Sequence, residues 1–108
     1  MQKVVQSLNN LGLIAEMLPP EFLEKGEARK FKIAGLTGDF DVEILQVEPH
    51  TKIAEHQHDT NWEVQVCLTT GEILGVCFVG GSHELVNDTD KPWEVLCLKG
   101  NNGATLFY

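Results

Sequence analysis

The sequence predicts one small all-β domain, because short strands recur at regular intervals and tight-turn residues separate them. Segments rich in Val, Ile, Leu and aromatic residues follow one another at intervals of roughly ten residues, as in sandwiches and barrels. The expected strands are residues 31–33, 41–47, 62–68, 73–79, 84–87, 93–98 and 105–108. Turn-forming residues stand at 36–39, 69–72, 80–81, 87–88 and 100–103.

The strand expected over residues 62–68 shows which side of the domain is hollow. Successive residues of a strand point to opposite faces. One face therefore carries only apolar side chains and the other carries polar ones: Val64, Val66 and Leu68 against Glu63, Gln65 and Cys67. We expect the polar face to line a cavity and the apolar face to pack elsewhere.

Residues 1–30 differ in pattern from the rest of the chain. Apolar residues recur at helix-like spacing over residues 4–17, and Pro19-Pro20 ends that segment. A single helical turn is expected at residues 21–25, stopped by Gly26. We therefore expect an N-terminal extension with a short helical segment over residues 1–30, packed on a barrel formed by residues 31–108.

The charge balance limits the partners. The formal net charge is −8, from eight Lys and Arg against sixteen Asp and Glu, and Arg29 is the only arginine. Nucleic acids and anionic membranes bind clustered Lys and Arg, so neither is an expected partner. The same shortage favours a small, mostly neutral ligand, although a bound metal would supply positive charge locally.

The cysteines and the first residues bear on the compartment. An odd number of cysteines on apolar stretches indicates reduced, buried thiols in a cytoplasmic protein; they are Cys67, Cys77 and Cys97. Polar residues at positions 6, 9, 10 and 16 interrupt the apolar N-terminal segment. It is therefore not expected to act as a signal peptide or to span a membrane.

Three of the four histidines form a candidate metal site with one glutamate. His56 and His58 are two residues apart, so on a strand both imidazoles project from one face. Glu63 follows after a short turn, and His83 follows the glycine turn at residues 80–81. Neutral imidazoles with one carboxylate suit Zn, Ni, Fe, Mn, Co or Cu. Each residue alone is more typical of an exposed position, and only the joint pattern indicates a site.

The joint pattern resembles the two motifs of small single-domain cupins. The first motif of that family matches in His56, His58, Glu63 and, one residue late, Gly71; the second matches in Gly80, His83 and Asn87. His50 stands where the first motif has glycine, and a histidine adopts a left-handed turn conformation more readily than most residues. Phe78 replaces the proline of the second motif. These departures affect loops and leave the candidate ligands in place.

The resemblance implies a fold and a metal centre. The fold is a double-stranded β-helix, or jelly-roll barrel, with one divalent metal ion per chain inside it on His56, His58, Glu63 and His83. Asn87 would be structural. Three further residues are candidates for the cavity or for supporting the ligands: Gln65, Cys67 and His50. The resemblance identifies no catalytic residue.

Three functions remain open at this point. The barrel could be an enzyme of dioxygenase, isomerase or lyase type acting on a small neutral molecule. It could instead be a non-catalytic module that holds a metal or metabolite. It could also be mainly a structural barrel that forms a homodimer through its apolar outer face.

Overall fold

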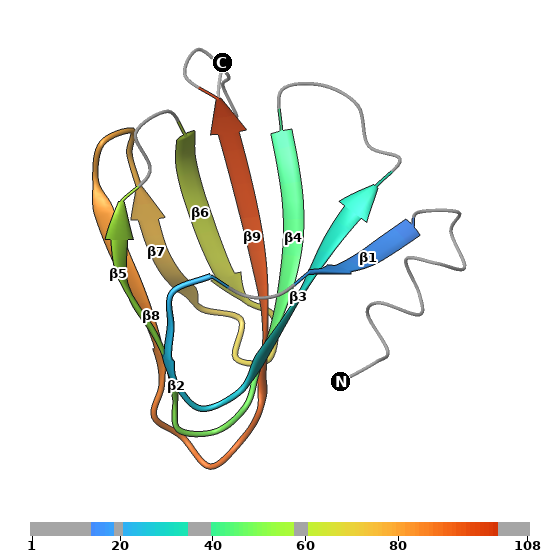
Figure 1. Cartoon of the computed structure of the whole chain (residues 1–108), viewed down its shortest axis with the longest axis vertical. Helices are drawn as coiled ribbons and strands as arrows, with labels where there is room; N and C mark the ends of the chain where they lie inside the picture. Colours follow the sequence, from blue (N-terminus) through green and yellow to red (C-terminus); the bar gives the residue numbers. More distant parts are fainter. Residues whose placement is uncertain (1–13, 19–20, 35–39, 58–60, 102–108) are drawn as a thin grey trace.

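The computed structural model describes residues 14–18, 21–34, 40–57 and 61–101 (Figure 1). These residues form strands and turns and contain no helix. The strands are β1 (Ile14–Leu18), β2 (Leu23–Lys25), β3 (Ala28–Ala34), β4 (Phe40–Val47), β5 (Thr51–Gln57), β6 (Asn61–Cys67), β7 (Ile73–Cys77), β8 (Ser82–Asn87) and β9 (Trp93–Asn101).

The strands form two antiparallel sheets, as expected for a jelly-roll barrel. The larger sheet has the order β1-β3-β4-β9-β6-β7, and the smaller has the order β2-β5-β8. β9 is central to the larger sheet because it pairs with β4 along one edge and with β6 along the other. The larger sheet curves round from β7 to β1, and the smaller sheet lies against one side of it (Figure 1).

The core forms where the two sheets meet. It combines Leu45 and Val47 of β4 and Val95 and Cys97 of β9 with Ile53 of β5 and Leu85 of β8. Burial of aliphatic side chains between two sheets is the main source of stability in such a fold. β5 and β9 both end, and β6 begins, at the end of the barrel drawn at the top in Figure 1.

The alternation expected along residues 62–68 is confirmed. Glu63, Gln65 and Cys67 are buried, with 3%, 6% and 0% of their surface exposed. Val64 and Val66 are half-buried on the opposite face, and Leu68 is exposed. The polar face therefore points between the sheets.

The two helical expectations are wrong where they can be compared. Ile14–Leu18, at the end of the segment expected to be helical, is strand β1 and pairs with β3. Leu23–Lys25, within the expected helical turn, is strand β2 and pairs with β5. Both segments lie at open sheet edges, where backbone pairing outweighs the weak helical spacing. Residues 4–13, the turn at 36–39 and the strand at 105–108 lie outside the described residues.

A buried asparagine, Asn87, links the turn after β4 to the turn after β8. Asn87 is fully buried, and its Nδ2 donates to the carbonyl oxygens of Val47, Glu48 and Lys91 at 3.2, 3.2 and 2.9 Å. Its Oδ1 accepts from the backbone N and the hydroxyl of Thr89 at 3.1 and 2.6 Å. Asn87 is thus structural, as the resemblance implies.

A glycine allows β2 and β5 to approach each other closely. Gly26 has φ +85°, and an added Cβ would lie 2.6 Å from the Cα of Thr51. The hydroxyl of Thr51 accepts from the backbone N of Glu27 at 3.0 Å and donates to its carbonyl at 3.1 Å. The hydroxyl therefore links β5 to the backbone directly after Gly26.

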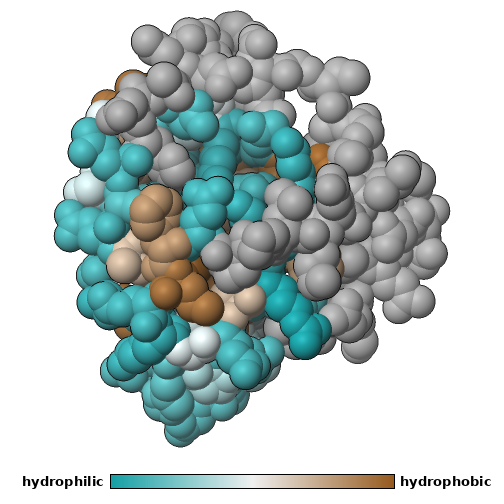
Figure 2. All heavy atoms as spheres, viewed as in Figure 1, coloured by the Kyte–Doolittle hydropathy of each residue, from teal (hydrophilic) through white to brown (hydrophobic). Residues whose placement is uncertain are grey.

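In the coloured part of Figure 2 hydrophilic residues predominate, and a hydrophobic group lies near the centre of the view. Phe22 and Leu23 are the apolar residues of the β2 region, and they are 53% and 39% exposed. No helix among the described residues is long and apolar enough to cross a membrane.

Candidate functional site

Two of the predicted metal ligands meet between β5 and β8. His56 and His83 are register partners on these antiparallel strands, so their side chains leave the sheet side by side. Their Nε2 atoms are 2.8 Å apart, and the rings meet edge to face. On the other side of His56, the ring of Phe22 stacks at 4.5 Å, almost parallel to it.

The hydrogen bonding of His56 orients one nitrogen toward His83. Its Nδ1 lies 2.9 Å from the carbonyl oxygen of Ala54. A carbonyl only accepts, so Nδ1 carries the hydrogen and Nε2 of the neutral ring presents a lone pair. A backbone carbonyl that fixes the distal nitrogen in this way is typical of histidines that bind metals.

Glu63 approaches His83 from the larger sheet. Its Oε2 lies 3.7 Å from Nδ1 of His83 and accepts a 2.6 Å hydrogen bond from Nε2 of Gln65. The Glu63 side chain is 3% exposed. The structure therefore places Glu63 at Nδ1 of His83, whose Nε2 faces His56, and places Gln65 where it orients the carboxylate.

The donors fit part of a metal centre. Two imidazole nitrogens bound to one ion at about 2.1 Å lie roughly 3 Å apart when the bonds are at right angles. The 2.8 Å between His56 and His83 is close to that value. Among the described residues, however, no group of three or more His, Cys, Asp or Glu side chains is gathered closely enough to hold a metal ion. His58, the fourth predicted ligand, lies outside the described residues.

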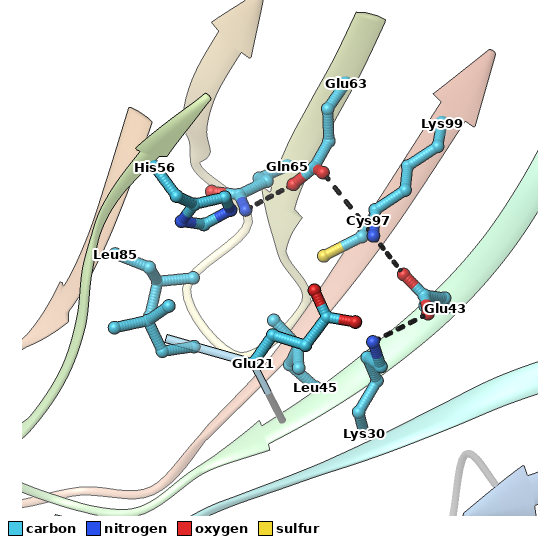
Figure 3. A pocket seen from close by; sticks show the side chains of 11 residues that line it. Glu21, Lys30, Glu43, Leu45, His56, Glu63, Gln65, Leu85, Cys97 and Lys99 are labelled. Carbon is cyan, nitrogen blue, oxygen red and sulfur yellow. Dashed lines mark hydrogen bonds and ion pairs between the residues drawn. The ribbon is translucent and has the colours of Figure 1, made fainter. Parts of the chain in front are cut away.

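His56, Glu63 and Gln65 line an open hollow between the sheets, with about 460 Å³ of empty space when the part open to solvent is included (Figure 3). Its apolar side consists of Leu45, Ile53 and Leu85. Its polar side includes charged groups that the sequence did not indicate: Glu21, Lys30, Glu43 and Lys99. The cavity-lining cysteine is Cys97, while Cys67 lies deeper on β6 and is not among the lining residues.

Four charged side chains form a row across adjacent strands of the larger sheet, and we call them the charge row. In spatial order they are Lys30 on β3, Glu43 on β4, Lys99 on β9 and Glu63 on β6. Glu43 lies 3.4 Å from Lys30 and 2.6 Å from Lys99, and Lys99 lies 3.8 Å from Glu63 (Figure 3). The signs alternate, so the row has no net charge.

Burial and the charge row together shift the pKa values of Glu43, Lys99 and the neighbouring Cys97. Burial favours a raised pKa for Glu43, but Lys99 and then Lys30 outweigh burial and hold that pKa below its usual value. Burial favours a lowered pKa for Lys99, but the carboxylates of Glu43 and Glu63 outweigh burial and raise that pKa above its usual value. Burial, followed by the charge of Glu63, raises the pKa of the Cys97 thiol, so it is unsuited to act as a nucleophile.

His50 lies away from the cavity. It occupies the turn between β4 and β5 with φ 56°, the left-handed conformation expected of it. Its ring pairs with Asp88 at 3.4 Å and Asp90 at 3.0 Å, and all three side chains are exposed. The structure thus gives His50 a role in joining two turns.

No protein-family model matches the sequence, and no curated protein matches it closely. Solved structures share its fold. A predicted oxalate decarboxylase from Thermotoga maritima is 17% identical with a TM-score of 0.64, over 82% of this chain and 93% of that one. A Cupin 2 conserved barrel domain protein from Salinispora arenicola is 18% identical with a TM-score of 0.56, over 84% and 77%. The plu4264 protein of Photorhabdus luminescens is 15% identical with a TM-score of 0.62, over 84% and 85%. The chain is therefore a small barrel domain with the cupin fold.

Proposed function

We propose that this cupin-like barrel binds one divalent metal ion on His56, His58, Glu63 and His83, and binds or transforms a small, mostly neutral organic molecule beside it. The observation that carries the proposal is the 2.8 Å approach of the His56 and His83 nitrogens, with the Glu63 carboxylate 3.7 Å from His83. When bound, the metal would act as a Lewis acid toward an oxygen of the ligand. Three His and one Glu leave a position for that oxygen.

The charge row supports a neutral ligand. Lys30 and Lys99 line the cavity, but Glu43 lies within ion-pair distance of both and Glu63 of Lys99. An anion would have to compete with these carboxylates for the two ammonium groups. A neutral molecule with a polar edge needs no such exchange, and its apolar side can face Leu45, Ile53 and Leu85.

Metal analysis of protein purified without a nickel column tests the centre. We expect about one equivalent of a divalent metal in the wild type, and less than a tenth in His56→Ala and His83→Ala, because each loses a ligand nitrogen. His58→Ala tests the ligand outside the described residues and should behave in the same way.

His50→Ala is the matched control, because His50 is the histidine that pairs with Asp88 and Asp90 away from the cavity. It should keep the full metal content. A wild type with less than a few tenths of an equivalent would rule out the centre. Equal loss in His50→Ala and His83→Ala would rule out the ligand assignment.

A second candidate role is a homodimer, and an apolar surface outside the barrel favours it. Val64 pairs with Val76, and Val66 with Ile73, on the outer side of β6 and β7. Val76 and Ile73 are 55% and 68% exposed, which is unusual for neighbouring apolar residues on a monomer. Light scattering should give about twice the chain mass of 12.0 kDa. Ile73→Lys should return the mass to that of the monomer, and a monomeric wild type would refute the dimer.

The sequence-based expectation of a cytoplasmic protein remains part of the proposal. It is supported by the three cysteines, which are all buried free thiols.

A further inference from the structure

We propose that Lys99 and Glu43 are positioning residues that set the affinity of the candidate metal centre by acting on Glu63. This inference rests on the proposed function, because it assumes that Glu63 is a metal ligand. Lys99 would weaken metal binding, and Glu43 would offset that effect by pairing with Lys99. The charge row would thus act as a fixed electrostatic control on the centre.

The contacts assign each oxygen of Glu63 to a different neighbour. Oε2 faces His83 at 3.7 Å. It also accepts from Gln65 at 2.6 Å, while Oε1 faces Nζ of Lys99 at 3.8 Å (Figure 3). Glu63 and Lys99 are also register partners on β6 and β9, so the sheet itself keeps them side by side. The position of the ammonium group therefore does not depend on a flexible loop.

Burial makes these charges effective. The side chains of Lys99, Glu43 and Glu63 are 19%, 8% and 3% exposed. Water screens such charges poorly, so one unit of charge a few ångströms from a divalent cation alters its binding strongly. In the wild type the nearest charge, Lys99, is neutralised by Glu43 at 2.6 Å. Removing Lys99 takes the ammonium group away from Glu63, whereas removing Glu43 leaves Glu63 as the carboxylate that still faces Lys99.

The two substitutions are therefore expected to act in opposite directions. Lys99→Met removes the ammonium group that faces Glu63. Glu43 keeps its ion pair with Lys30, and the affinity for Zn²⁺ should rise about tenfold. Glu43→Gln keeps the size and a hydrogen-bond acceptor but leaves Lys99 uncompensated beside Glu63. The affinity for Zn²⁺ should then fall about tenfold. A purely structural role would make both variants weaker, because both disturb the same buried pair.

Competition between the chelator-treated protein and a chromophoric zinc chelator measures these affinities, with circular dichroism to confirm folding. Lys30→Met is the matched control, since it removes the same charge from the charge row. Lys30 lies on β3, three strand positions or roughly 14 Å from β6, so the affinity should change less than threefold. Lys99→Gln serves as a second variant with the same expected sign should Lys99→Met unfold.

The outcomes are separable. Opposite shifts in the Lys99 and Glu43 variants with little change in Lys30→Met support the inference. Shifts of the same sign, or equal shifts in all three variants, overturn it while leaving the metal centre in place. A wild type that does not bind Zn²⁺ overturns the proposed function, and this inference with it.

Discussion

Replacement of Gly26 by alanine is expected to lower the free energy of unfolding by about 3–4 kcal/mol. Gly26 has φ +85°, where a side chain costs about 1–2 kcal/mol. The new Cβ would also lie 2.6 Å from the backbone Cα of the buried Thr51, which a rotamer change cannot relieve. The barrel must then move β2 away from β5 and lose the hydrogen bonds between Thr51 and Glu27. Chemical denaturation of the two proteins measures the difference.

Gly71→Ala is the control for this prediction. Gly71 has nearly the same φ, +80°, but no atom outside its chain neighbours lies within 4 Å of the added Cβ. Gly71→Ala should therefore lower the free energy of unfolding by only about 1 kcal/mol, the cost of a side chain at positive φ. If the two variants were equally stable, close packing at Gly26 would not contribute.

Replacement of Asn87 by alanine should lower the free energy of unfolding by about 3 kcal/mol, which is the second large effect that we expect. The amide donates to three carbonyl oxygens and its oxygen accepts from Thr89, and alanine leaves these groups without it in a fully buried space. Asn87→Asp should be at least as destabilising, because a carboxylate oxygen would then face those carbonyls. Thermal or denaturant unfolding at neutral pH measures both.

Thr70→Ala is the comparison for Asn87. Its hydroxyl accepts a 3.3 Å hydrogen bond from the backbone N of Glu72 in an exposed turn. A loss of about 0.5 kcal/mol is expected there, because water replaces the bond. An equally small loss in Asn87→Ala would show that its network does not stabilise the loops.

Most strands could be predicted from the sequence because their signals are local. Alternation along residues 62–68 and the turn at Gly80 depend on neighbouring residues only. The predictions at residues 14–18 and 21–25 are wrong because the structure of these segments depends on residues far away in the sequence. Those segments become strands through pairing with β3 and β5, and a short apolar pattern cannot reveal such distant partners.

The candidate site also contains some residues that local sequence signals indicate and others that only the strand order brings together. His56, Glu63 and His83 are indicated by a resemblance to the cupin motifs, and Gln65 follows from the alternation around Glu63. Lys30, Glu43 and Lys99 belong to no motif and become neighbours only through the strand order β3-β4-β9-β6. Knowledge of that order, with the alternation of β4 and β9, would have placed Glu43 and Lys99 on the inner face.

The charge row also bears on how the chain finds its correct strand alignment. A slip of β9 by one residue against β4 and β6 would turn Lys99 outward and bring Leu98 opposite Glu63 and into the Glu43 side of the cavity. Two largely buried carboxylates would then face an apolar side chain, which costs several kcal/mol. The hydrophobic core favours the alignment in which the apolar side chains point inward. The alternating charges favour the same alignment independently. Misaligned sheets are therefore strongly disfavoured during folding, even though β9 reaches its partners only after most of the chain has been synthesised.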